Sequence, residues 1–362
     1  MKRNIIKFCV LARTAALVLA LPAAAEPPET EPLVDEAVLT ERIEDYLTQR
    51  GIPKNNVGIG FYYSGTDEAC YYHGDDWFYS ASMYKVPLTM AYAAREAAGE
   101  LTAESPVGGL QLATIERYLL VNSNNEFAHA ALSQLGGGSE PQGRVYYKQF
   151  ADLPDSYYDN RFTSASFFTP RYMTLCMKTL YDAPENFPRI HDLLLESQPD
   201  DFFRKSLGGE YEIAQKYGAW EEWNGATAIV YTPHSIILTV MTHNVGNYAP
   251  VIAELGRLMA DYALELDEAL AERVAEQARL EEEQSAAELQ LPEPTAQPQE
   301  PVPTAAPQPE APTVVQPQPQ TVPQTDAERD HTLLPLYAVL AAAAVGELVL
   351  SLTKKKPKQR RT

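Results

Sequence analysis

The feature that most limits how this chain can fold is a run rich in proline and glutamine near its C-terminal end. Proline stands at eleven positions between Pro292 and Pro323, and glutamine, alanine, threonine and glutamate fill most of the others. A segment of this composition buries too little apolar surface to form a core and favours the extended polyproline II conformation. We therefore predict a disordered stalk over residues 291–332, so any globular domain must lie before it.

Both ends of the chain combine an apolar run with basic residues. Residues 1–25 carry three basic side chains among the first seven, then an apolar run that closes with three alanines, as a cleaved secretory signal does. Residues 333–353 are long and apolar enough to cross a bilayer as one helix, and the basic residues 354–362 should stay on its cytoplasmic side. These patterns predict an exported protein that is held in the cell membrane by a single pass, with its folded domain outside the cell.

Charge and cysteine content exclude several kinds of partner. The 362 residues include 29 Lys and Arg against 49 Asp and Glu, a formal charge of −20, which argues against nucleic acid because phosphate contacts need clustered cations. The three cysteines form no C-x-x-C pair and no H-E-x-x-H motif is present, so we expect no metal and no cofactor. Whether Cys70 and Cys176 pair in an oxidising exterior stays open.

Residues 33–266 carry the periodic patterns of a folded domain. Two strand pairs are predicted, one near each end, and helical patterns fill most of the sequence between them. This order predicts a mixed α/β domain, with one sheet built from both chain ends and an inserted helical region. A charged, solvated helix should follow over residues 267–290. The predicted strands cover residues 56–63, 69–73, 226–231 and 235–242, and the longest predicted internal helices cover residues 80–98 and 114–135.

Ser82 and Lys85 form an S-x-x-K motif. Residues three apart on a helix share one face, so the lysine amine can lie beside the serine hydroxyl. An amine whose pKa is lowered by burial can act as the base for that serine, and the first helical turn offers free N–H groups to a developing negative charge. The motif says little alone, because residues 351–354 match it at the predicted membrane edge.

Two further motifs follow in order along the chain. Residues 123–125 are the only S-x-N sequence, and residues 216–218 are the only K-x-G sequence. Lys216 supplies a positive charge, and Gly218 allows a substrate backbone to approach closely. Either tripeptide alone is expected on an ordinary surface. The ordered set of three motifs is poorly explained by chance.

The set S-x-x-K, S-x-N, K-x-G resembles that of the penicillin-recognising serine enzymes, most closely the class A β-lactamases and related low-molecular-weight peptidases. The similarity extends over nearly all of residues 33–266. It implies an antiparallel sheet flanked by helices, with an inserted all-helical region. It also implies acyl-enzyme chemistry on a β-lactam or a peptidoglycan stem peptide, and we expect a monomer.

The resemblance also implies a role for each matching residue. Ser82 would be the acylated nucleophile, and Lys85 its base or proton relay. Ser123 would carry a proton to the leaving nitrogen, while Lys216 would hold the electrostatics around Ser123 and the substrate carboxylate. The backbone N–H groups of Ser82 and of residue 219 would form the oxyanion hole. The implied substrate-binding residues are Asn125, Tyr217, Gly218 and Ala219.

The sequence departs from the family pattern in three places. Tyr217 stands where Thr or Ser is usual, and residues 226–231 contain no Arg for a second contact to a carboxylate. The E-x-x-L-N signature that positions the deacylating water is absent before residue 163. The carboxylates that stand in this stretch instead are Asp152, Asp155 and Asp159. Aspartate is shorter than glutamate by one methylene, and a displacement of ~1 Å can cost roughly 10²-fold in rate.

Three hypotheses therefore remain open. The first is a β-lactamase in which one of these aspartates replaces the missing glutamate. The second is a D,D-peptidase-like enzyme that penicillin traps. The third is a domain that has lost catalysis and binds wall fragments or an extracellular partner. Turnover of a chromogenic cephalosporin separates the first from the others, and covalent labelling by penicillin separates the second from the third.

Overall fold

The computed structural model describes residues 31–288. The predicted signal segment, the stalk, the membrane helix and the basic tail lie outside these residues, and those four predictions stay predictions. Between residues 31 and 288, no helix has the length and apolar character needed to cross a membrane.

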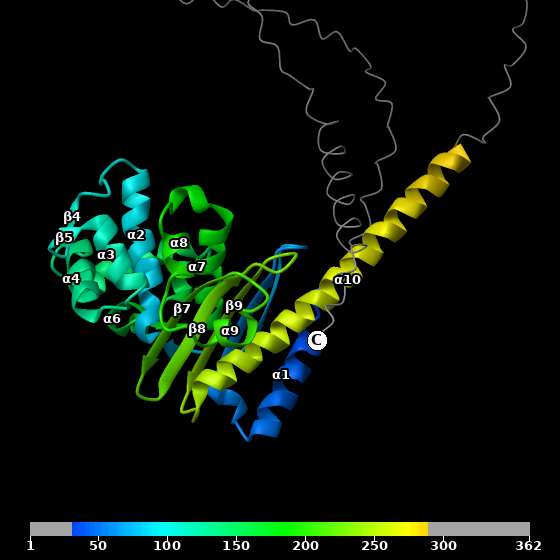
Figure 1. Ribbon diagram of the computed structural model, residues 1–362, viewed down its shortest axis with the longest axis horizontal. Helices are drawn as coiled ribbons and strands as arrows, with labels where there is room; N and C mark the ends of the chain where they lie inside the picture. Colours follow the sequence, from blue (N-terminus) through cyan, green and yellow to red (C-terminus); the bar gives the residue numbers. More distant parts are fainter. Residues whose placement is uncertain (1–30, 289–362) are drawn as a thin grey trace, which may run out of the picture. The chain divides into compact units, whose positions relative to one another are not determined.

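A five-stranded antiparallel sheet lies at the centre of the domain (Figure 1). Its order is β2-β1-β9-β8-β7, so the first strands of the chain lie beside the last ones, and Ile59 on β1 pairs with Val240 on β9. The prediction of one sheet made from both chain ends is confirmed. The five strands are β1 (Val57–Tyr63), β2 (Glu68–Tyr72), β7 (Ile213–Trp220), β8 (Trp223–Val230) and β9 (Ile236–His243).

Helices cover both faces of this sheet, and each face has its own buried core. α1 (Glu36–Arg50) and the first half of α10 (Tyr248–Glu288) pack on one face. α7 (Pro170–Asp182) and α2 (Lys85–Ala97) contribute to the core on the other face. Since both faces are covered, all seven residues of β1 are buried, and the strand reads as an apolar run instead of an alternating pattern.

The two cysteines of the domain lie in different cores. Cys70 on β2 belongs to the core under α1 and α10, whereas Cys176 on α7 belongs to the core of the opposite face. Both are buried free thiols. The disulfide considered from the sequence does not form, because the sheet separates the two side chains.

Two helices predicted as continuous are interrupted where the motifs lie. The predicted helix over residues 114–135 is wrong: α3 (Leu112–Leu120) ends before Ser123, and α4 (Asn125–Leu135) starts again after it. Asn124 caps α4 by accepting a hydrogen bond from the N–H of Phe127. The helix predicted over residues 80–98 is not capped by Ser80; a 3-10 turn, η2 (Ala81–Tyr84), precedes α2 instead.

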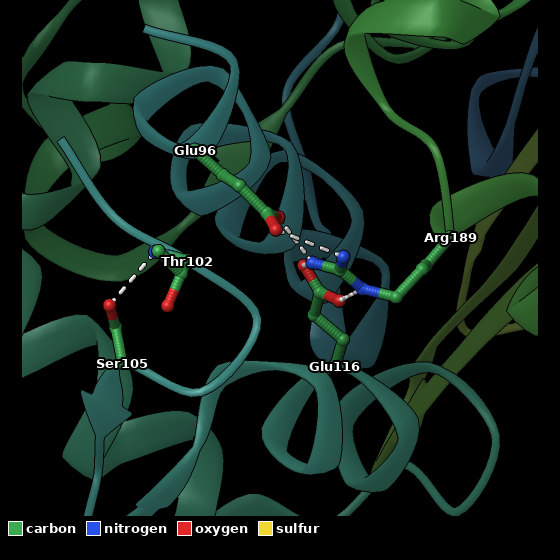
Figure 2. A network of polar contacts seen from close by, with 5 residues as sticks. All are labelled: Glu96, Thr102, Ser105, Glu116 and Arg189. Atoms are coloured by element: carbon green, nitrogen blue, oxygen red, sulfur yellow. Dashed lines mark hydrogen bonds and ion pairs between the residues drawn. The ribbon is translucent and has the colours of Figure 1, made fainter. Parts of the chain in front are cut away.

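A partly buried ion cluster ties the helices around the inserted region together (Figure 2). Arg189, just before α8 (Ile190–Leu195), pairs with Glu116 of α3 at 2.6 Å and also with Glu96 of α2. Glu116 is 1% exposed, and burial raises its pKa against the opposing effect of Arg189. Losing one partner of such a cluster leaves a buried charge unpaired, which is strongly destabilising.

The remaining elements are short. They join the inserted helices to one another and to the sheet, with two small strand pairs at the edges of the helical region. The helices are α5 (Glu140–Val145), α6 (Asn160–Ala165), α8 (Ile190–Leu195) and α9 (Phe203–Leu207), and the strand pairs are β3 (Phe78–Tyr79) with β6 (Phe167–Phe168) and β4 (Pro106–Val107) with β5 (Leu110–Gln111).

The last helix extends well beyond the sheet. α10 continues without a break to Glu288, through most of the residues predicted as a charged extension (Figure 1). Leu270 still packs against the core, but nearly all side chains from residue 271 to residue 286 are exposed. The sequence of this part of α10 is accordingly rich in charged residues and carries no continuous apolar stripe.

Candidate active site

The S-x-x-K motif lies where the 3-10 turn η2 passes into α2. Ser82 is in the turn, Lys85 is the first residue of the helix, and Lys85 Nζ lies 3.0 Å from Ser82 Oγ. Lys85 is completely buried, and this burial lowers its pKa to about 7. Since about half of such amines are uncharged at neutral pH, Lys85 is able to accept the Ser82 proton.

The S-x-N motif brings the loop between α3 and α4 to the same amine. Lys85 Nζ donates to Asn125 Oδ1 at 2.7 Å and to the backbone oxygen of Ser123 at 2.5 Å, and lies 3.3 Å from Ser123 Oγ. Ser123 has φ 55°, a left-handed conformation that is uncommon for a residue with a Cβ atom. Backbone strain of this kind collects at functional sites, and here it turns Ser123 towards Lys85.

Lys216 of the K-x-G motif approaches from β7. Its Nζ donates to Ser123 Oγ at 3.0 Å and to the backbone oxygen of Tyr217 at 3.0 Å. Burial lowers the pKa of Lys216 well below its usual value, and the charge of Lys85 lowers it further. The hydroxyl of Ser123 therefore lies between two amines, and a continuous path of polar atoms joins Ser82 to Lys216.

Gly218 allows β7 to pack directly against the turn that holds Ser82. A Cβ atom at this position would lie 2.4 Å from the backbone oxygen of Ser80 and 2.8 Å from the backbone nitrogen of Ser82. Both distances are too short for a side chain, so glycine is required by close approach. This contact fixes the relative position of the strand and the nucleophile turn.

A pocket of about 270 Å³ opens beside Ser82. Within the described residues, none of the side chains that line it is a carboxylate. Three of the residues singled out from the sequence line the pocket: Ser82, Asn125 and Ala219. The other lining residues are Tyr79, Ala81, Tyr84, His129, Arg144, Ser166 and Trp220.

Tyr217 does not line this pocket. Its ring stacks on Phe202, with a centroid distance of 5.1 Å and an interplanar angle of 17°. The ring also packs at the edge of the core under α1 and α10, and Lys216 Nζ lies 4.4 Å from its centre. A substrate contact of the kind expected from the usual Thr or Ser hydroxyl is therefore not formed by the Tyr217 side chain in this arrangement.

The three aspartates considered as replacements for the missing glutamate lie outside the pocket. Asp155 is exposed and pairs with Lys148 at 3.1 Å. Asp159 caps α6 and pairs with Arg161, and this pairing lowers its pKa. Asp152 is exposed. Their positions give no support to the hypothesis that one of them activates water next to Ser82.

Seven of the ten lining residues were missed from the sequence, among them Tyr84, Arg144 and Trp220. Tyr84 lies inside the S-x-x-K motif and Trp220 follows the K-x-G motif by two residues, so nearness to the motifs could have found both. Arg144 comes from the six-residue helix α5, and nothing in its local sequence signals the pocket. Taken together, the sheet, the inserted helices and the serine–lysine network define a serine hydrolase-like domain.

Comparison with protein families agrees with this class. The model of the β-lactamase enzyme family matches residues 38–111 and 109–263. These matches cover more than half of the chain, so the chain belongs to the β-lactamase enzyme family. No curated protein sequence matches it.

Solved structures confirm the fold. An ancestral class A β-lactamase, from the last common ancestor of Gram-negative bacteria, is 20% identical, with a TM-score of 0.52 over 62% of this chain and 99% of that one. A mutant of PBP-A, described as an acyl-enzyme complex with penicillin G, is 15% identical, with a TM-score of 0.54 over 65% of this chain and 100% of that one. The predicted class A β-lactamase-like fold of the domain is therefore confirmed.

Proposed function

We propose that this protein is an exported, membrane-anchored serine enzyme that recognises penicillin and forms an acyl-enzyme at Ser82. The observation that carries this proposal is the hydrogen-bond network of Ser82, Lys85, Ser123 and Lys216 at the pocket. The network holds a nucleophile, a buried amine of lowered pKa and a second hydroxyl within reach of one another. An inactive binding module has no need of this arrangement.

Acylation uses each of these groups in turn. Ser82 Oγ attacks the carbonyl carbon of a β-lactam or a peptide, and its proton passes to the neutral amine of Lys85. The oxygen that becomes negative is stabilised by the backbone N–H groups of Ser82 and Ala219. When the carbon–nitrogen bond breaks, Ser123 gives its proton to the leaving nitrogen and is reprotonated from Lys85, 3.3 Å away.

The lining of the pocket favours a peptidase over a β-lactamase. The opened β-lactam ring stays attached to the enzyme, and its nitrogen remains close to the ester bond at Ser82. Fast hydrolysis of this acyl-enzyme therefore needs a base that activates a water molecule. The described pocket presents Tyr84, Arg144 and Ser166 but no carboxylate. We therefore expect quick acylation by penicillin and slow deacylation. A peptidoglycan stem peptide is the proposed natural substrate, since its amine leaves the site after acylation.

The chain ends fit this substrate. The predicted signal sequence of residues 1–25 and the predicted span of residues 333–353 would place the domain outside the cell membrane. The predicted stalk, in a polyproline II conformation of about 3.1 Å per residue, would reach on the order of 100 Å into a cell wall. Export and anchoring are part of the proposal and rest on sequence patterns.

Labelling with a fluorescent penicillin, beside turnover of a chromogenic cephalosporin, tests the proposal. The full chain in detergent and its Ser82→Ala variant are compared, with circular dichroism to show that both are folded. We expect a label that requires Ser82 and lasts for hours, with almost no cephalosporin turnover. Rapid turnover would identify a β-lactamase instead. Failure of the folded protein to take the label would refute penicillin recognition and favour the binding module.

A further inference from the structure

Arg144 forms part of the pocket wall and is almost completely buried. It comes from α5, is 7% exposed, and lines the pocket together with Tyr84 and Ser166. A guanidinium at this depth must be paired, because an unpaired buried charge is costly. Its Nη2 donates to Glu140 Oε2 at 2.8 Å, and its Nη1 donates to the backbone oxygen of Thr163 at 3.2 Å.

The third contact of Arg144 leads towards the nucleophile. Its Nε donates to Ser166 Oγ at 2.6 Å. Ser166 has φ 53°, so it adopts a left-handed conformation that costs energy for a residue with a Cβ atom. The backbone oxygen of Ser166 accepts a hydrogen bond from the N–H of Ser80 at 3.1 Å, two residues before Ser82.

The turn that carries Ser82 is thus held from two sides. On one side, Gly218 of β7 packs against Ser80 and Ser82 at distances that leave no room for a side chain. On the other side, Ser166 holds the N–H of Ser80. Ala81, between them, has φ 43° and is itself in the left-handed region. A strained turn persists only where its surroundings fix it, and Arg144 stabilises one of the two fixing contacts.

The negative charge of Glu140, which pairs with Arg144, supports this arrangement. Burial works to raise the pKa of Glu140, but its hydrogen bond with His129 and the charge of Arg144 outweigh burial, so that the pKa is lowered. His129 Nδ1 lies 2.8 Å from Glu140 Oε1. Glu140 therefore stays ionised and keeps the guanidinium in place against Ser166.

We infer that Arg144 is a positioning residue for acylation, because it holds the left-handed conformation of Ser166 and thereby fixes the turn that carries Ser82. The effect on acylation rests on the proposed function. The effect on the turn is independent of the proposed function and can be measured separately. Arg144 acts here through Ser166 and Ser80, without touching the reacting atoms.

The first test separates the rate of acylation from the binding of penicillin. We expect Arg144→Met to lower the limiting rate of penicillin labelling by roughly 10- to 100-fold, because a displacement of ~1 Å costs about that much, while the half-saturating concentration changes by less than about threefold. Arg189→Met is the matched control. It also removes a paired arginine, whose partner is Glu116 (Figure 2), but neither residue lines the pocket, so Arg189→Met should lower the melting temperature and leave the labelling rate of the folded protein unchanged.

A rescue variant distinguishes positioning from a general structural role. Glycine adopts a left-handed conformation without the Cβ cost, so Ser166→Gly keeps the backbone oxygen in place when Arg144 is absent. The double variant Arg144→Met with Ser166→Gly should recover most of the lost rate. If Arg144→Met does not fold, Ser166→Ala takes its place, because it removes only the Oγ atom that Arg144 holds and should slow labelling in the same way.

Hydrogen exchange tests the turn without any penicillin. The peptide that spans residues 78–84 contains the N–H of Ser80, and it should exchange faster in Arg144→Met or Ser166→Ala than in the wild type or Arg189→Met. Unchanged exchange in this peptide, or no recovery of rate in the double variant, would overturn the inference. If the wild type takes no label, the proposed function fails, and the exchange result still decides the role of Arg144.

Discussion

Replacing Asn125 with aspartate should shift the pH dependence of Ser82 acylation upward. In the wild type, burial alone lowers the pKa of Lys85 from 10.5 to about 7. Acylation should therefore rise about tenfold per pH unit below pH ~7 and level off about one unit above it. A lysine of ordinary pKa is uncharged in only about one molecule in 3,000 at pH 7, so burial increases the population of the base by on the order of 10³.

The size of the shift follows from the geometry of the network. Asn125 Oδ1 lies 2.7 Å from Lys85 Nζ, and a carboxylate placed there favours the charged amine. A negative charge at this distance raises the pKa of an amine by about 1–3 units. The midpoint of the profile should move to about pH 8–10, and the acylation rate at pH 7 should fall by roughly 10- to 1,000-fold.

The rate of fluorescent-penicillin labelling is measured at saturating penicillin from about pH 5 to about pH 10. It gives the midpoint of the pH profile for the wild type and for Asn125→Asp. Asn124→Asp is the matched control: this side chain caps α4, where aspartate serves as well as asparagine, and in the described residues it is not among the hydrogen-bond partners of Lys85 Nζ. Its profile should match the wild type. A wild-type rate that does not change with pH, or equal midpoints in the wild type and Asn125→Asp, would show that Lys85 is not the base.

Three further results are expected. Because burial lowers the pKa of Lys85, Lys85→Met should abolish labelling yet raise the free energy of unfolding in urea at pH 7 by about 1–4 kcal/mol, and a less stable variant would contradict this expectation. For the same reason the stability of the wild type should rise between pH ~7 and ~10.5, where the unfolded chain binds one more proton than the folded chain. Gly218→Ala should slow labelling by at least about 10²-fold, since its Cβ would lie 2.4 Å from the Ser80 oxygen, and a wild-type rate would refute the close-approach argument. Cys70 and Cys176 should both be alkylated in unfolded protein without reductant, as peptide mapping can check, and a linked peptide would contradict the separate cores.

The sequence was most informative where chemistry restricts the residue type. Ser82, Lys85, Ser123 and Lys216 stand in three motifs far apart in the chain, and the structure brings their side chains within hydrogen-bond distance. Four of the five strands of the central sheet were also predictable, because buried strands at both chain ends have no other partner of similar apolar character, whereas β7 was not among the predicted strands. Spacing and residue type were enough in both cases.

The local conformation around the site was not predictable in this way. The helical pattern of residues 114–135 hides the break at Ser123, because helical periodicity persists on both sides of a short left-handed turn. Arg144 enters the pocket through contacts with Ser166 and Thr163, about twenty residues further along the chain. Neither the break nor these contacts leaves a periodic signal, since both depend on tertiary packing.

The intact mass of the protein after exposure to benzylpenicillin tests most directly whether Ser82 is the nucleophile. We expect a mass increase of one whole penicillin, since ring opening releases no leaving group, with the adduct mapped to Ser82 and stable for hours. The Ser82→Ala variant should show no increase. A folded wild-type protein that gains no mass, or that carries the adduct on another residue, would contradict the claim that Ser82 is the nucleophile.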